Sequence, residues 1–460
     1  MKALADPDNA LAAGLAAIRE QFQVPASFPA DVLAAADTAA RRAPADHVDR
    51  TATRFVTLDP ASSTDLDQAF AIERAGGDLL LHYAIADVAW FVEDGDAIDT
   101  EAWRRGTTLY LPGGKAGLYP PALSEGAASL LPGGPRPAVI FTVRVAPDGA
   151  VHLDAAERAV IQSTAKLAYD SVRAADLPPD FAELARRIHG AEDRRGAERV
   201  DPPEQEVAAV DGGFELVFRP RLKSEEHNAA LSLAANMAIA DALHASRTGL
   251  FRVMSEPDER AVKRLRHTAR AFGLAWPAAA TLAQFERTLD PADPRQAAFM
   301  LAIRRAGNGA SYQPWREGAP PWHAAMAATY AHATAPLRRL ADRYVMQATL
   351  AIANAQPVPD NVTQAFEKLP AVMARADGLA GQIERAVVDL AETVMLAGGE
   401  GRNFQAIVTD KDDRGARIQL VDLPIVARVV AHGVTPGDEI RVKLTDVDPV
   451  RRTLAFQRMA

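Results

Sequence analysis

The sequence predicts an α+β fold in which a large domain of strands and helices is flanked by a small helical N-terminal region and a C-terminal OB-type β-barrel. The period-two alternation typical of strands dominates residues 54–145, whereas the middle of the chain has apolar residues three and four positions apart, as in helices. Strands therefore precede helices, which favours an α+β arrangement over repeated βαβ units. At 460 residues the chain also exceeds one usual hydrophobic core, so small appended domains are expected.

Residues 1–50 are expected to form short helices. Ala and Leu recur at helical spacing from Leu11 to Phe22, the segment Pro25–Pro29 breaks the pattern, and a second helix is predicted over 31–42. This region is either a helix-turn-helix-like unit or a packing extension of the next domain. Acidic residues interrupt its apolar stretches, so it predicts neither a signal peptide nor a membrane span, and we expect a soluble protein.

The large domain is predicted to span residues 51–398. Its first half contains strand segments and a loop rich in Gly and Pro from Leu111 to Pro121; the strands are RFVTLDP, LLLHYAIADVAWFV and PAVIFTVRVAP. Its second half has four helical segments, SLAANMAIADALHASRTGLF, DERAVKRLRHTARAFGL, RQAAFMLAIRRAG and PLRRLADRYVMQATLAIANA. The domain is therefore expected to combine a β-rich core with a helical second half.

The C-terminal region, residues 399–460, returns to short strands separated by polar turns: FQAIVTD, ARIQLVD, IVARVVA, DEIRVKLTDVD and TLAFQRM. Five short strands in a segment of this size are what a small OB-type barrel requires. Residues 401–460 carry 10 Lys and Arg against 8 Asp and Glu, a net charge of +2 in a chain whose net charge is −9. This sign suits a region that holds a nucleic-acid strand.

The residue types present limit the chemistry. Cysteine is absent, which excludes disulfides, thiolate metal sites and a cysteine nucleophile, and is compatible with a reducing cytoplasm. The ten histidines show no zinc-binding spacing, and there is no serine nucleophile elbow. The segment LPGGKAGLYPP lacks the phosphate-loop pattern, because Lys115 is followed by alanine, so we assign it to a substrate-facing loop without specific chemistry.

The most informative segment is TLDPASSTDLDQAF, which begins at Thr57. It follows a predicted strand and places Asp59, Asp65 and Asp67 within nine residues, separated by Ser and Thr in the composition of a loop. Carboxylates this close repel one another unless a cation neutralises them, and hard oxygen ligands suit Mg²⁺ or Mn²⁺. The alternatives are a solvated acidic turn and a calcium loop, although the turn glycine and bidentate glutamate of an EF-hand are missing.

This segment resembles the catalytic signature of the ribonuclease II and ribonuclease R family, in which four closely spaced acids follow a Thr-Ile-Asp opening. Four later segments resemble the family's following blocks in the same order: LHYAIADVAWFVEDGDAIDTEAWRRGTTLYLPGG, STAKLAYD, EEHNAALSLAANMAIADAL and YAHATAPLRRLADRYV. In the last block Ala335 stands where serine is usual. The resemblance covers residues 50–395, and the C-terminal strands are similar to the family's RNA-binding barrel.

The resemblance implies metal-dependent hydrolysis of single-stranded RNA from its 3′ end to nucleoside 5′-monophosphates, with Mg²⁺ as cofactor and Mn²⁺ as its substitute. Asp59, Asp65 and Asp67 match three of the family's four acids and are expected metal ligands; Asp67 is also expected to be catalytic. Gln68 stands where the fourth acid is usually aspartate. An amide oxygen can coordinate a metal but brings no charge.

The resemblance also implies roles for residues outside the acidic segment. Arg338 matches the arginine that binds the RNA backbone near the scissile phosphate, and Glu384 in QIERAVVDL matches a catalytic glutamate. Tyr110 matches the aromatic residue that stacks on the terminal base, Phe214 is its partner by spacing, and Tyr169 lies in another substrate-binding block. Without the resemblance, Tyr110 would be interpreted as structural and Glu384 as an ordinary helix-surface acid.

The full expectation is a cytoplasmic monomer without membrane contact or an obligate protein partner, which degrades RNA and lacks the family's usual pair of N-terminal cold-shock domains. Two alternatives stay open. One is an RNA-binding protein with weak catalysis, in which Gln68 marks the loss of the metal site. The other is a metal-dependent phosphodiesterase that acts on DNA.

Overall fold

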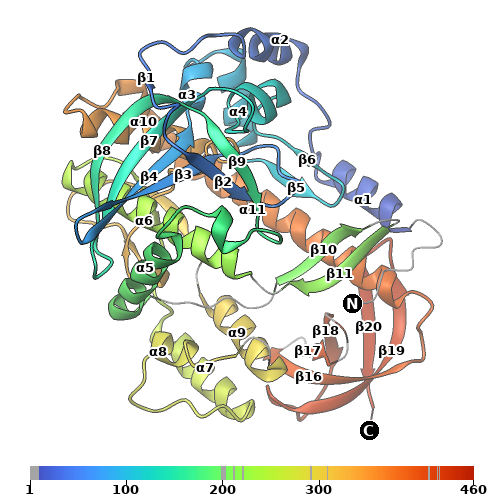
Figure 1. Ribbon diagram of the computed structural model, residues 1–460. Coiled ribbons are helices and arrows are strands. Elements are labelled where there is room, and N and C mark those ends of the chain that lie inside the picture. Colours follow the sequence, from blue (N-terminus) through green and yellow to red (C-terminus); the bar gives the residue numbers. More distant parts are fainter. Residues whose placement is uncertain are drawn as a thin grey trace.

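A computed structural model of the chain describes residues 10–197, 204–210, 213–219, 222–290, 293–307, 309–412, 415–421, 423 and 425–459. Within these ranges the α+β prediction is confirmed, because a seven-stranded sheet is combined with helices and with a closed five-stranded barrel. Figure 1 shows the sheet and the barrel at opposite ends of the molecule, with α11 (Asp360–Leu396) between them. None of the helices in the described ranges has the length and apolar character needed to cross a membrane.

The central sheet has the strand order β1-β8-β7-β4-β3-β2-β9. Its strands are β1 (Val48–Asp49), β2 (Phe55–Asp59), β3 (Gln68–Ala75), β4 (Asp78–Ala86), β7 (Arg136–Val145), β8 (Val151–Ile161) and β9 (Ser163–Ala168). The outermost pairs β1–β8 and β2–β9 are parallel, and the others are antiparallel. The ends of β2, β4 and β9 and the start of β3 therefore meet at one edge of the sheet.

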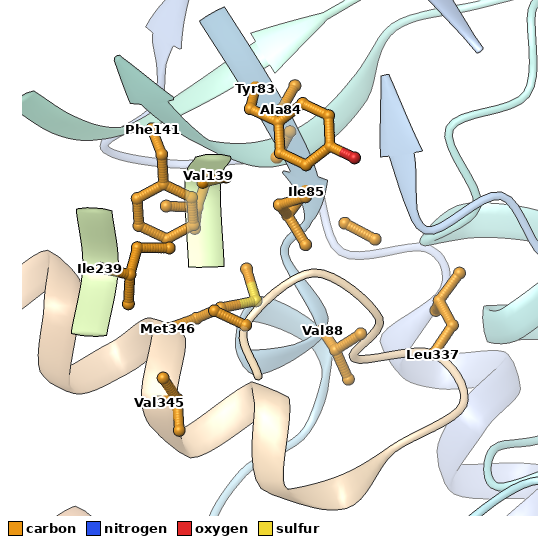
Figure 2. Packing of buried hydrophobic residues seen from close by; sticks show 14 of the residues in the cluster. Tyr83, Ala84, Ile85, Val88, Val139, Phe141, Ile239, Leu337, Val345 and Met346 are labelled. Carbon is orange, nitrogen blue, oxygen red and sulfur yellow. The ribbon is translucent and has the colours of Figure 1, made fainter. Parts of the chain in front are cut away.

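One face of the sheet packs on α6 (Lys223–Ala245) and α10 (Leu340–Ala353). Alternate side chains of a strand point to the same face, and on β4 those of the odd-numbered residues 79–85 are fully buried. Figure 2 shows this core, with side chains from β4, β7, α6 and α10 packed together: Tyr83, Ile85, Phe141, Ile239 and Met346. Since α6 is buried on most sides, it forms the centre of the domain.

Two sequence predictions for local structure were wrong. The segment LLLHYAIADVAWFV is not one strand, since β4 ends at Ala86 and a short helix, α3 (Val88–Phe91), follows. The chain turns at Asp87, whose buried carboxylate is 3.1 Å from Arg158 Nε and 3.3 Å from His47 Nε2. The loop predicted from Leu111 to Pro121 contains most of a hairpin, formed by β5 (Leu109–Leu111) and β6 (Gly114–Ala116).

The predicted N-terminal helices are confirmed as α1 (Ala10–Gln21) and α2 (Ala30–Ala39). Each packs on the large domain: α1 lies against α11, and α2 lies against α4 (Ala97–Arg105). Apolar side chains of α1 and α11 share one cluster, which includes Leu11, Ile18, Ile383 and Leu390.

The remaining helices and hairpins surround the sheet and extend toward the barrel. They are α5 (Phe181–Arg195), β10 (Glu204–Val210), β11 (Gly213–Arg219), β12 (Leu250–Val253), α7 (Glu259–Ala271), α8 (Leu282–Glu286), α9 (Pro294–Ala306), β13 (Ser311–Pro314), β14 (Trp322–His323) and β15 (Ala328–Thr329). Figure 1 shows α7, α8 and α9 grouped beside the barrel, and α9 contacts β16.

The C-terminal strands form the barrel that the sequence predicts. They are β16 (Asn403–Asp412), β17 (Gly415–Leu420), β18 (Val426–Val430), β19 (Glu439–Asp448) and β20 (Thr453–Arg458), closed in the order β16-β17-β18-β20-β19. A five-stranded closed barrel of this kind is OB-like. Leu396, the last residue of α11, belongs to the barrel's apolar core, and Glu392 Oε1 of α11 accepts a 3.0 Å hydrogen bond from the Val426 amide. The barrel is thus attached directly to α11.

Candidate active site

The loop between β2 and β3, residues 60–67, is held firmly at the edge of the sheet. The Leu66 amide donates to Ser129 Oγ at 2.9 Å, and the Leu66 carbonyl accepts from the Leu130 amide at 3.0 Å. On the other side, Lys166 Nζ donates to the Ala61 carbonyl at 2.8 Å. The Leu66 side chain is fully buried. The acidic segment is therefore an anchored loop and not a solvated turn.

Asp67 joins this loop to the segment that precedes α10. Its Oδ1 accepts a 2.7 Å hydrogen bond from the Leu337 amide, and its Oδ2 lies 3.4 Å from Arg338 Nε. Only 4% of Asp67 is exposed. Burial raises the pKa of Asp67 to about 7, although the nearby Arg338 guanidinium and the Leu337 amide act in the opposite direction. The protein thus keeps a carboxylate that titrates near neutral pH beside an arginine.

Asp59, the last residue of β2, has an oxygen available for a ligand. Its Oδ2 is buried and forms no hydrogen bond within the described part of the chain. Burial raises the pKa of Asp59 to about 6, opposed by Arg338 and reinforced by Asp65. A buried carboxylate oxygen without a partner is costly unless a cation or a proton meets it. This is the feature of the site that fits a hard metal ion.

Within the described ranges, no group of three or more His, Asp or Glu residues lies close enough together to hold a metal ion by itself. The three aspartates of the loop therefore do not form one ligand cluster. The observations that fit a cation concern Asp59 and Asp67, which share electrostatic contact with Arg338. Any metal would take its remaining ligands from water or substrate, as Mg²⁺ commonly does.

Arg338 and Arg339 have different roles. Arg339 is bound to Asp342 through two hydrogen bonds, from Nε at 2.9 Å and from Nη2 at 2.8 Å, and Asp342 also accepts from the Ala335 amide at 2.7 Å. The backbone before α10 is thereby fixed. The Arg338 side chain is 46% exposed and points its Nε toward Asp67. Arg338 is thus the arginine that can reach a substrate phosphate.

Backbone hydrogen bonds also fix the segment around Arg338. The Arg338 carbonyl accepts from the Thr108 amide at 3.0 Å and from Thr107 Oγ1 at 2.8 Å, which links the segment to the chain just before β5. Asn236 of α6 accepts from the Ala333 amide at 2.9 Å. Through these bonds two elements distant in sequence, the chain before β5 and α6, fix the backbone that carries the Arg338 guanidinium next to Asp67.

The two predicted substrate tyrosines contact different aspartates, Tyr110 contacting Asp65 and Tyr169 contacting Asp59. Tyr110 is 55% exposed and donates from its hydroxyl to Asp65 Oδ2 at 3.3 Å. Tyr169 follows β9, and its hydroxyl accepts from Asn228 Nδ2 at 2.8 Å. Burial, together with the charge of Asp59, raises the pKa of Tyr169 to about 12. An exposed ring such as that of Tyr110 is available for stacking on a base.

Asp65 has a partner that the sequence interpretation missed. Lys115 Nζ on β6 lies 2.9 Å from Asp65 Oδ1 and 3.1 Å from Glu125 Oε1. Thr64 Oγ1 donates to the other oxygen of Glu125 at 3.0 Å. The assignment of Lys115 to a loop was therefore wrong, since it lies in β6, and its ion pairs were not predicted. A signal was present, because a Pro-Gly-Gly turn between Leu111 and Lys115 favours a hairpin that places residue 115 opposite Tyr110.

Gln68 is the first residue of β3, and its side chain is engaged by the core. Its Oε1 accepts a hydrogen bond from the Tyr83 hydroxyl, and the residue pairs with Ile85 of β4. The metal-binding role of Gln68 stays a prediction.

Of the last two predicted residues, one lies apart from this group in the described structure and the other has an undescribed side chain. Glu384 is exposed on α11, and no described contact connects it to the acidic loop. Phe214 falls in β11, where its backbone is paired with Ala209, but its side chain lies outside the described residues. The structure thus brings together Asp59, Asp65, Asp67, Arg338 and Tyr110, while Tyr169 lies at the end of β9 beside Asp59.

Comparisons with known proteins agree with this geometry. Residues 47–354 match the RNB domain, and residues 402–459 match the C-terminal S1 domain of RNase II-type exonucleases. The chain is 25% identical to ribonuclease R of Thermotoga maritima, over 89% of this chain and 62% of that protein. It is 29% identical to exoribonuclease 2 of Cronobacter sakazakii, over 83% of this chain and 62% of that protein. The chain therefore spans less than two thirds of the length of these relatives.

Solved structures share the fold. RNase R of Mycoplasma genitalium in complex with ribose-methylated single-stranded RNA superimposes with a TM-score of 0.85 at 20% identity, covering all of this chain and 79% of that one. Yeast Ssd1, described as a pseudonuclease, superimposes with a TM-score of 0.69 at 15% identity, covering 96% of this chain and 57% of that one. The fold thus occurs both with RNA bound and in a protein described as a pseudonuclease.

Proposed function

The chain belongs to the RNB-domain family, and on that premise we propose that it is a hydrolytic exoribonuclease that removes nucleotides from the 3′ end of single-stranded RNA. The observation that carries the proposal is the contact between Asp67 and Arg338, beside the unpartnered oxygen of Asp59. This arrangement places an anion-binding guanidinium directly next to a cation-binding carboxylate, as phosphodiester hydrolysis requires.

The reaction consumes one water. The water oxygen bonds to the phosphorus of the last phosphodiester. The bond from that phosphorus to the 3′ oxygen of the preceding nucleotide breaks, and the released 3′ oxygen takes up a proton. The products are a nucleoside 5′-monophosphate and an RNA shortened by one nucleotide with a free 3′ hydroxyl. Arg338 binds the phosphate oxygens and stabilises the charge that develops on them, since a guanidinium can donate two parallel hydrogen bonds.

We assign metal binding to Asp59 and Asp67, with Mg²⁺ as the cofactor and Mn²⁺ as a substitute. When bound, the ion supplies Lewis acidity that lowers the pKa of a water and offsets the phosphate charge. Asp67 is held in place for this task by the Leu337 amide. The sequence also predicts Asp65 and Gln68 as ligands, but the oxygens of Asp65 contact Lys115 and Tyr110, and the Gln68 oxygen accepts from Tyr83.

The substrate contacts follow from exposure and charge. The exposed ring of Tyr110 stacks on the terminal base, which is worth about 1 to 3 kcal/mol and does not depend on base identity. The C-terminal barrel, with its net charge of +2, binds the RNA backbone further from the 3′ end. We also assign the protein to the reducing cytoplasm, because a chain without cysteine has no disulfides to be reduced there. We propose that it is a monomer.

The test uses single-stranded RNA and DNA labelled at either end, with and without Mg²⁺. We expect the 3′-labelled RNA to release labelled mononucleotide at once and the 5′-labelled RNA to shorten stepwise, both only with Mg²⁺. Equal degradation of DNA would favour the phosphodiesterase alternative. RNA binding without hydrolysis at any Mg²⁺ concentration would favour a binding protein and overturn the enzyme assignment.

Gln68 sharpens this test. Gln68→Asp adds a negative charge beside the loop and should lower the Mg²⁺ concentration needed for half-maximal rate, with a modest change in the maximal rate. If the wild type is inactive and only Gln68→Asp hydrolyses RNA, the protein is a family member that has lost its catalytic activity.

A further inference from the structure

Lys115 is placed between two carboxylates at the edge of the acidic loop. The β5–β6 hairpin pairs it with Tyr110, and its ammonium lies 2.9 Å from Asp65 Oδ1 and 3.1 Å from Glu125 Oε1. Its side chain is 22% exposed and that of Asp65 is 11% exposed. The pair is therefore shielded from solvent much more than an ordinary surface ion pair.

This contact makes Asp65 different from Asp59. One oxygen of Asp65 faces the Lys115 ammonium and the other accepts from the Tyr110 hydroxyl at 3.3 Å, so both are engaged. Asp59, in contrast, has a buried oxygen without a partner in the described chain. Asp59 can therefore bind a metal ion, whereas the charge of Asp65 is already neutralised by the Lys115 ammonium.

We infer that Lys115 is a fixed cation of the active site, which holds Asp65 and Tyr110 in position and lets one divalent metal ion suffice where a two-metal site would need a pair. The inference rests on the proposed function. Lys115 is a positioning residue, because it acts through Asp65 and does not itself contact the substrate. An ammonium can take over the charge compensation of a second metal, but the water-activating chemistry belongs to the ion beside Asp59 and Asp67.

The experiment counts bound Mn²⁺ by electron paramagnetic resonance on the full chain without RNA. We expect one Mn²⁺ per chain in the wild type, two in Lys115→Met and one in Lys115→Arg, which keeps the charge. Lys166→Met is the matched control. It removes the same charge near the loop but releases no carboxylate, because Lys166 Nζ donates to the Ala61 carbonyl, so it should still bind one ion. Lys115→Gln is a second neutral variant in case Met disturbs folding.

A second readout is the Mg²⁺ dependence of RNA hydrolysis, whose Hill slope should be about 1 in the wild type and rise toward about 2 in Lys115→Met. Two Mn²⁺ ions in the wild type, or a single ion in both folded neutral variants, would overturn the inference. Failure of the proposed function looks different: a wild type that binds one Mn²⁺ but never hydrolyses RNA would refute the activity and leave the role of Lys115 intact.

Discussion

The acidic loop has two parts that differ in the surroundings of their carboxylates. The buried pair consists of Asp67, which is buried, and Asp59, which is half-buried but has a buried Oδ2 without a partner in the described chain. The two lie at the two ends of the loop, and burial raises the pKa values of both. The rim group consists of Asp65, Lys115, Glu125 and Tyr110, which are bound to one another. Acids that are close in sequence therefore need not share one task. The buried pair is suited to hold a cation, and the rim group is suited to position side chains that face the substrate.

The largest expected effect is the difference in hydrolysis rate between an Asp→Asn substitution in the buried pair and one in the rim group. Asp67→Asn should lower the hydrolysis rate by about 1000-fold, because it removes a charge that holds the metal, while RNA affinity should change little. Asp65→Asn should cost only about tenfold, since it weakens the contact with Lys115. Single-turnover rates and RNA dissociation constants for both variants test this. Equal losses in the two variants would show that the buried pair and the rim group are one functional unit.

Arg338 contacts the buried pair, so its removal should have the next largest effect. Arg338→Ala should reduce kcat by about 100-fold, and Arg338→Lys should restore only part of the loss, because an ammonium lacks the planar pair of donors. The measurement is kcat and KM on one short RNA. A change confined to KM would mean that Arg338 binds the ground state and does not stabilise developing charge.

Tyr110 belongs to the rim group and should have a smaller effect of another kind. Tyr110→Ala removes a stack worth about 1 to 3 kcal/mol, so the final undegraded fragment should change in length while hydrolysis continues. Tyr110→Phe keeps the ring and loses only the hydrogen bond to Asp65, and its end product should match that of the wild type. Electrophoresis of the end products checks both. An unchanged fragment in Tyr110→Ala would make this tyrosine structural.

The smallest effect concerns stability. The folded-state pKa values of about 6 for Asp59 and about 7 for Asp67 lie above the usual 3.8, so the folded protein binds protons that the unfolded chain has released. The stabilising contribution is complete below pH 4 and is lost as pH rises through 6 and 7. In EDTA, Tm should therefore fall by about 2 to 5 °C between pH 5.5 and pH 8, and Mg²⁺ should restore it at pH 8.

The control for that measurement is the double variant Asp59→Asn/Asp67→Asn, in which this part of the pH dependence should vanish. Asp65→Asn should keep most of it, because burial is the main cause of the raised pKa values and Asp65 only adds to it. A wild-type Tm that rises with pH in EDTA, relative to the double variant, would contradict the raised pKa values.

The sequence was informative wherever local pattern and structure coincide. Period-two alternation located the five strands of the barrel, and the spacing of Asp59, Asp65 and Asp67 located the loop. The division of that loop was not predictable from spacing. The bond from the Leu337 amide to Asp67 joins residues 270 positions apart, and no local pattern encodes it.

Lys115 and Gln68 show a second limit of sequence reasoning. Lys115 was dismissed because it failed to match a known motif, although the turn before it specified its partner across the hairpin. Gln68 was predicted as a metal ligand because it stands where the resembling family usually has its fourth aspartate. In the structure the Gln68 oxygen accepts a hydrogen bond from Tyr83 in the core, a contact that the pattern of this segment does not indicate.

The 37-residue helix α11 has a consequence for how RNA length is sensed. The β5–β6 hairpin of the site shares an apolar cluster with Ile383 of this helix, and the barrel is joined to the helix through Leu396. At a rise of about 1.5 Å per residue, these two positions are roughly 20 Å apart. A helix of this kind acts as a spacer of constant length, unlike a flexible linker that can contract. An RNA too short to reach from the acidic loop to the barrel cannot be accommodated by movement of the barrel. Affinity should therefore drop in one step at a defined number of nucleotides, and processive degradation should become distributive at that same length.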